Sequence, residues 1–243
     1  MAQKPAERRP ETGWGEKLPK FFDTGVRIEN HARDGRSTRT FIEEDRWKKL
    51  LDKVQTGDYV FIQFGHNDER PAKTSYTPPE DFRRNLAGFV VDVRARKATP
   101  VLITPVMRRR FDAQGELQDT HGAYPDIVRK LAAEQAVALM DLHRDSARVL
   151  REYGAEKSKE LFLFLAPGAN PNYPRGLEDN SHFSPLGAEE MAALAVDAIR
   201  ELLPDLARHL KEPAGKGEQH PYALARQRVD GGRGDALAAR PAS

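Results

Sequence analysis

Residues 65–68 (Gly-His-Asn-Asp) place polar side chains of a catalytic type directly after a strongly apolar segment. The amide of Asn67, together with a neighbouring backbone N–H, could donate hydrogen bonds to the oxyanion that forms when an ester or amide is attacked. Glycine, asparagine and aspartate are also common in turns, so a purely structural turn explains this cluster equally well when it is taken alone.

Residues 179–182 (Asp-Asn-Ser-His) form a second cluster of this kind. A carboxylate and an imidazole three residues apart can face one cleft, where Asp179 would hold the tautomer of His182 and His182 would act as a base toward a hydroxyl. The alternative is a loop leading into a helix, because Ser184 followed by Pro185 is typical of a helix N-cap.

Residues 30–37 (Asn-His-Ala-Arg-Asp-Gly-Arg-Ser) form the third cluster. Gly35 could present its backbone N–H to an oxyanion. It could equally serve only to let the chain adopt a positive φ angle.

The hydrophobic pattern predicts the elements that position these clusters. Residues 59–64 form the strongest strand and are almost continuously apolar, as expected for a strand covered on both faces of a parallel sheet. The pattern predicts other strands at 26–28, 100–104 and 137–141, helices at 14–22, 41–54, 80–97, 123–135, 143–153 and 184–203, and loops at 30–39 and 165–183. This alternation predicts an α/β fold, in which ligands bind beyond the carboxyl ends of the strands.

Composition excludes several other classes of protein. The 243 residues suit one domain, and 39 Lys and Arg nearly balance 37 Asp and Glu, so we expect neither a nucleic-acid nor a membrane partner. The absence of cysteine excludes disulfides and thiolate metal sites. We predict one domain over residues 1–210 and a disordered tail over 211–243, which is rich in Gly, Ala and Arg and lacks a hydrophobic period.

Taken together, the three clusters resemble the later sequence blocks of SGNH (GDSL-type) hydrolases. Longer strings, namely residues 57–68, 30–37, 104–106 and 172–174, resemble the rhamnogalacturonan acetylesterase branch of that superfamily. The resemblance covers residues 1–203. It implies a three-layer αβα, flavodoxin-like parallel sheet and a carbohydrate esterase that removes acetyl groups from pectic saccharides without metal or organic cofactor.

The resemblance also implies a role for each matching residue. Asn67 would donate its side-chain amide to the oxyanion and Gly35 its backbone N–H. His182 would be the general base, and Asp179 would orient it.

Four further residues lie in loops on the expected side of the sheet and are candidates for saccharide binding: Arg109, His121, Asn172 and Tyr173. An arginine can pair with the carboxylate of a galacturonate. Exposed loop charge is the competing interpretation.

The sequence departs from the family pattern at the nucleophile. Family members begin with a strand that ends in Gly-Asp-Ser, and no such tripeptide occurs here. We therefore expect that residues 1–5 follow shortly after the missing serine, that the first strand of the sheet is lacking, and that the chain is destabilised and forms no acyl-enzyme. Ser37, Ser181 and Ser184 are poor substitutes, because family members do not use the first of these positions and the other two flank His182.

Two alternatives remain open. A pseudoenzyme would bind saccharide without hydrolysis. A metal-dependent hydrolase could use five scattered side chains that lack the spacing of a ligand set, namely His66, Asp68, His121, His143 and Asp179. Oligomeric state is not readable from the sequence. A short missing segment would favour a cytoplasmic location, and a longer one would favour secretion.

Overall fold

The computed structural model describes residues 1–212, and residues 1–210 form one compact unit. Its centre is a parallel sheet in the order β1 (Tyr59–Gln63), β2 (Thr99–Ile103) and β3 (Ala138–Met140). Two further strands, β4 (Phe162–Leu165) and β5 (Leu177–Phe183), pair with each other in an antiparallel ribbon. The predicted tail lies largely outside the described residues.

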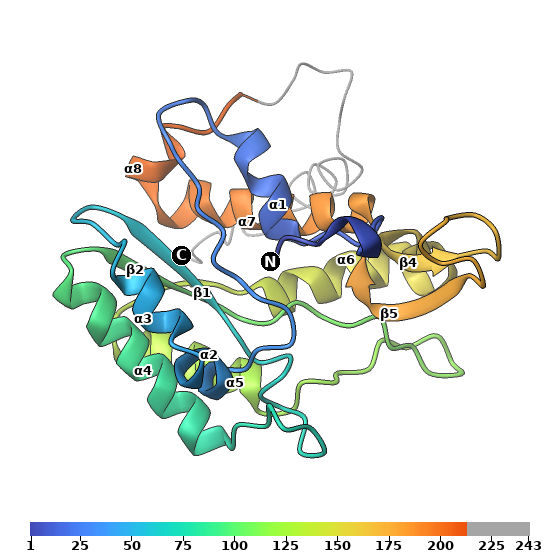
Figure 1. The fold of residues 1–243 in the computed structure, drawn as a ribbon, viewed down its shortest axis with the longest axis horizontal. Coiled ribbons are helices and arrows are strands. Elements are labelled where there is room, and N and C mark those ends of the chain that lie inside the picture. The colour runs from blue at the N-terminus through green and yellow to red at the C-terminus, as the bar shows by residue number, and fades with distance from the viewer. Residues whose placement is uncertain (213–243) are drawn as a thin grey trace, which may run out of the picture. The chain divides into compact units, whose positions relative to one another are not determined.

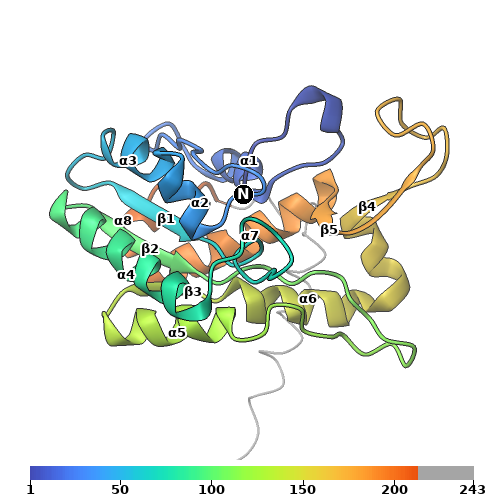
Figure 2. The same ribbon diagram turned by 60° about the horizontal axis from the view of Figure 1, so that its bottom comes forward.

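Helices cover both faces of the parallel sheet and make a three-layer α/β fold. On one face lie α2 (Thr38–Glu43), α3 (Arg46–Leu51), α4 (Pro79–Ala95) and α5 (Tyr124–Glu134); on the other lie α1 (Trp14–Lys17), α6 (Leu142–Lys157), α7 (Pro185–Leu202) and α8 (Pro204–Ala207). Figures 1 and 2 show α4 and α7 on opposite sides of the strands. None of the described helices is long and apolar enough to cross a membrane.

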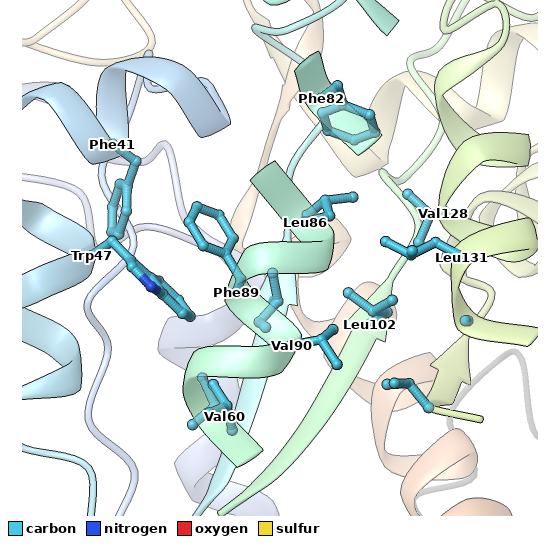
Figure 3. Packing of buried hydrophobic residues seen from close by; sticks show 14 of the residues in the cluster. Phe41, Trp47, Val60, Phe82, Leu86, Phe89, Val90, Leu102, Val128 and Leu131 are labelled. Atoms are coloured by element: carbon cyan, nitrogen blue, oxygen red, sulfur yellow. The ribbon is translucent and has the colours of Figure 1, made fainter. Parts of the chain in front are cut away.

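The core on the α4 side follows from the spacing of apolar residues in that helix. Phe82, Leu86, Phe89 and Val93 recur every three or four positions, and all four side chains are buried. Figure 3 shows Phe82, Leu86 and Phe89 packed against the strands and against α3 and α5, and Val93 belongs to the same cluster. The ring of Phe89 stacks on Trp47 with a centroid separation of 4.0 Å, which joins α3 to α4.

On the opposite face, α7 packs tightly because small residues line its first turns. A Cβ added at Gly187 would lie 1.9 Å from the carbonyl oxygen of Leu161, so this position has room only for glycine. The helix begins at Ser184, whose hydroxyl accepts the backbone N–H of Gly187 at 3.1 Å. The N-cap predicted at Ser184 and Pro185 is therefore present, and it fixes the end of β5 directly before it.

Three predicted elements are wrong. Residues 26–28 form no strand, because no described segment pairs with them. The helix predicted over 41–54 is interrupted at Asp45, which has a left-handed φ of 56° and separates α2 from α3. The loop predicted over 165–183 contains β5, whose polar sequence gave no apolar alternation to detect.

The outer side of β1 borders a large cavity of about 1460 Å³. Segment 25–29 and the full length of β1 both line it. Among the described strands β1 pairs only with β2, and its side chains are buried on one face but only partly buried on the other. Coverage of β1 on both faces is therefore incomplete: Tyr59, Phe61 and Gln63 are only partly buried, and all five residues of the strand line this cavity.

Candidate active site

Asp179 and His182 form a hydrogen-bonded pair at the edge of the cavity. The Nδ1 atom of His182 lies 2.6 Å from Oδ2 of Asp179, and Oδ1 of the same carboxylate accepts the backbone N–H groups of Ser181 and His182 at 2.7 and 3.0 Å. Burial opposes ionisation of Asp179, but these hydrogen bonds outweigh it and lower the pKa of the carboxyl group. Nε2 of His182, the other ring nitrogen, makes no hydrogen bond within residues 1–212.

An irregularity in β5 brings the two side chains together. In the ribbon, Phe162 pairs with Phe183 while the next residue, Leu163, pairs with Asp179, so residues 180–182 bulge out of the ladder. Arg109 holds the bulge: its backbone N–H donates to the carbonyl of Asn180 at 2.9 Å, and its guanidinium to Oδ1 of Asn180 at 2.6 Å.

The loop after β1 is anchored by a buried carboxylate. Asp68 accepts the backbone N–H and the hydroxyl of Thr38 at 2.8 and 2.6 Å, and the N–H of Gly65 at 3.1 Å. Burial raises the pKa of Asp68 even though these hydrogen bonds favour the ionised form. This carboxylate ties the start of α2 to the loop that carries Asn67.

The predicted oxyanion donors lie at the same cavity as His182. The side-chain amide of Asn67 donates to the carbonyl of Arg36 at 3.3 Å, which places it beside Gly35. Gly35 has a φ of 75°, and a Cβ there would meet nothing within 4 Å. Asn67, Gly35 and His182 all line the cavity, although their catalytic roles stay predictions.

An ionic cluster that sequence reasoning missed lies between the loop of Gly35 and the side chain of His182. Lys4 Nζ lies 2.6 Å from Oε1 of Glu11 and 2.5 Å from Oδ1 of Asp34, and Arg8 contacts the same two carboxylates. Glu11 Oε1 in turn lies 3.9 Å from Nε2 of His182. Residues 1–13 are polar and have no apolar period, so nothing in their pattern indicated that Lys4 and Glu11 would be buried.

The predicted saccharide-binding residues are engaged in contacts within the protein. The Arg109 guanidinium bonds Ser158 as well as Asn180, the Asn172 amide donates to the carbonyls of Ala6 and Arg9, and the Tyr173 hydroxyl donates to that of Arg8. These contacts hold residues 6–9 and the β5 bulge in place. A saccharide contact at these three positions stays a prediction.

The ring of His121 is buried, although its position in a loop suggested exposure. It is 1% exposed and packs behind His66, with its Nε2 atom 2.9 Å from Nδ1 of that residue. His121 is not among the residues that line the cavity, and a direct contact between this residue and substrate stays a prediction.

The five residues considered for a hydrolytic metal site do not converge. Asp68 is committed to Thr38 and Gly65, and Asp179 to His182. His121 and His143 do lie close together, and Asp119, which was not considered, lies beside them.

No serine hydroxyl within residues 1–212 hydrogen-bonds Nε2 of His182. Ser37 is fully buried and caps α2 through the N–H of Thr40, and the hydroxyl of Ser184 donates to the carbonyl of Glu160. Ser181 lies next to His182 in the bulge but has no contact with its ring. The predicted base, its carboxylate partner and the two predicted oxyanion donors therefore lie at or beside one cavity, and no alcohol within residues 1–212 is paired with the predicted base.

Fold and site together define a hydrolase of the α/β type that carries an Asp–His pair in its antiparallel β4–β5 ribbon. Residues 2–190 match the model of the GDSL-like lipase/acylhydrolase family, and the chain belongs to that family. By family it is a hydrolase of carboxylic esters.

Relatives in Bacillus subtilis support the resemblance found in the sequence. The chain is 42% identical to the rhamnogalacturonan acetylesterase RhgT over 212 residues, which cover 87% of this chain and 90% of the relative. It is 34% identical to the probable rhamnogalacturonan acetylesterase YesY over 195 residues, covering 78% and 84% of the two chains.

Solved structures confirm the fold. Protein YxiM of Bacillus subtilis superposes with a TM-score of 0.67 and 26% identity over 79% of this chain and 50% of that one. The acetylxylan esterase Axe2 of Geobacillus stearothermophilus superposes with a TM-score of 0.58 and 19% identity over 81% and 89% of the two chains.

Proposed function

We propose that this chain is the catalytic domain of a carbohydrate esterase that removes acetyl groups from rhamnogalacturonan or related pectic oligosaccharides. The observation that carries the proposal is the Asp179–His182 pair, in which His182 lines the same cavity as Asn67 and Gly35. The identity to two named or probable rhamnogalacturonan acetylesterases supports the choice of substrate.

The reaction would be acyl transfer through a serine alcohol. Nε2 of His182 takes the proton of the alcohol as its oxygen attacks the acetyl carbonyl, and Asn67 and Gly35 donate hydrogen bonds to the oxyanion. The bond to the sugar oxygen then breaks, and His182 returns the proton to that oxygen. Water attacks the acetyl-enzyme in the same way and releases acetate.

We propose further that the printed chain lacks the attacking alcohol and is inactive by itself. The experiment compares it with two chains lengthened at the amino end by an apolar strand that ends in Gly-Asp-Ser or Gly-Asp-Ala, using p-nitrophenyl acetate and acetylated rhamnogalacturonan oligosaccharides. Only the chain that ends its added strand in Gly-Asp-Ser is expected to hydrolyse these substrates, at a rate about a million-fold above that of the other two chains. His182→Ala in that form removes the activity.

Each other outcome contradicts a stated part of the proposal. Turnover by the printed chain that depends on His182 would show that it holds its own nucleophile. Saccharide binding without hydrolysis in every form would favour the pseudoenzyme. A serine form that cleaves p-nitrophenyl acetate but no pectic acetyl group would reject the substrate.

A further inference from the structure

A group of three potential metal ligands lies outside the ester-cleaving site, where the loop before α5 meets the first turn of α6. The ligand atoms of Asp119, His121 and His143 all lie within 4.8 Å of one another. Oδ1 of Asp119 is 3.0 Å from Nε2 of His143 and 3.8 Å from Nδ1 of His121. We propose that these three side chains bind a zinc ion.

The state of His121 points to a ligand at this place. Its side chain is almost fully buried, and its Nδ1 atom has no hydrogen-bond partner within residues 1–212. Buried polar atoms without a partner are rare in folded proteins, because losing water without a replacement costs free energy. An ion bound at Nδ1 would supply the missing partner, and the exposed carboxylate of Asp119 leaves a path from solvent.

The donor set selects the kind of ion. Two imidazoles and one carboxylate suit zinc, which takes four ligands and keeps one position for water when the protein supplies three. Calcium and magnesium prefer oxygen ligands alone, which makes them poor candidates. Ligand atoms around a tetrahedral zinc ion lie about 3.3 Å apart. Two of the separations here, 3.0 and 3.8 Å, lie near this value, and no pair of ligand atoms is more than 4.8 Å apart.

Contacts behind the ligands already orient them. Nε2 of His121 lies 2.9 Å from Nδ1 of His66, and the backbone N–H of His143 donates to the Thr104 hydroxyl at 2.8 Å. Zinc on Nδ1 of His121 would leave the proton on Nε2 and direct it to His66. His66 precedes Asn67, so the ion would brace the loop of the predicted oxyanion donor without taking part in ester cleavage.

Titration calorimetry of the printed chain with zinc sulfate tests the site, and cobalt(II) absorption gives an independent readout of tetrahedral coordination. We expect one ion per chain, and His143→Gln and Asp119→Asn are expected to weaken binding by at least about 100-fold. Both side chains lie near the surface, so these variants should fold, and their far-ultraviolet circular dichroism checks that they do. His209→Gln is the matched control, since His209 contacts Asp23 at 3.3 Å in a similar pair without a third ligand.

Two results would overturn the proposal. The first is the absence of saturable binding of one zinc ion by the unaltered chain, which would leave Asp119 and His143 as a simple ion pair. The second is unchanged affinity in both His143→Gln and Asp119→Asn, which would place the ion elsewhere. Because neither measurement uses ester hydrolysis, failure of the proposed esterase activity would be seen separately.

Discussion

Strands β1 and β2 are neighbours of similar apolar composition, yet they are buried very differently. From Pro100 to Ile103, every residue of β2 is buried, whereas in β1 only Val60 and Ile62 are buried. Among the described strands β2 has a neighbour on each edge, while β1 has one strand partner and borders a cavity on its outer side. Burial of an apolar strand therefore depends on the partners around it as much as on its own residues.

The largest expected effect comes from filling the space beside β1. An amino-terminal extension of about six apolar residues ending in alanine should pair with β1 and raise the free energy of unfolding. Burying each side chain contributes about 1.5–3 kcal/mol and ordering each backbone unit costs about 1–2 kcal/mol, so we expect a net gain of roughly 2–5 kcal/mol. Thermal melting would shift upward by about 2–4 °C for each kcal/mol.

A glycine–serine extension of equal length is the control for added chain length, since it has no apolar side chains to bury. Equal melting temperatures for the apolar extension and the printed chain would show that the space beside β1 does not accept a strand. The difference in burial between β1 and β2 would then have another cause.

A smaller effect on the free energy of unfolding is expected when one residue of either strand is replaced by alanine. Leu102 in β2 is fully buried, so Leu102→Ala should lower the free energy of unfolding by about 2–5 kcal/mol. Phe61 in β1 is partly exposed at the cavity, so Phe61→Ala should cost only about 1 kcal/mol. Urea unfolding of both variants measures the difference.

The same Phe61→Ala change in the apolar-extended chain should cost more, because the added strand would cover that side chain. Equal losses for Leu102→Ala and Phe61→Ala in the printed chain would contradict the partial exposure on which the comparison depends.

The elements that could be predicted are those whose signal lies in their own residues. The apolar strands at 59–64 and 100–104 and the periodic helix at 80–97 agree with the structure within one or two residues. The strand predicted at 26–28 failed because a strand requires a partner, and β5 was missed because its residues are polar and its pairing with β4 is a long-range fact. A left-handed residue such as Asp45 likewise gave no warning in the hydrophobic pattern.

The candidate site likewise contains residues that the sequence could predict and residues whose placement depends on distant parts of the chain. Asp179 and His182 could be proposed because their spacing suits one chemical task, and the structure does join them. The cluster of Lys4, Glu11 and Asp34 could not be predicted, because it depends on charges far apart in sequence sharing one buried place. His121 shows the reverse case, since a loop position suggested exposure while tertiary packing buried the ring.

The smallest expected effect on the free energy of unfolding comes from the Asp179 carboxylate at the edge of the cavity. Its pKa is lowered in the folded chain, where hydrogen bonds from His182 and the backbone outweigh burial, so folding favours the ionised form. Such a group stabilises the fold above its unfolded pKa of about 3.9, and the contribution is lost as the pH falls through the lower folded value.

Asp179→Asn should therefore reduce the free energy of unfolding at pH 7, and the gap to the unaltered chain should narrow below about pH 4. Urea unfolding between pH 3 and pH 7 measures this, with Glu178→Gln as control, an exposed carboxylate on the same strand whose loss should change stability by less than about 0.5 kcal/mol. If the difference in free energy of unfolding stays constant down to pH 3, Asp179 stabilises the fold through its packing and neutral hydrogen bonds and not through its charge. Because Asp179 and His182 lie at the edge of the cavity, Asp179→Asn should lower the free energy of unfolding by less than Leu102→Ala does.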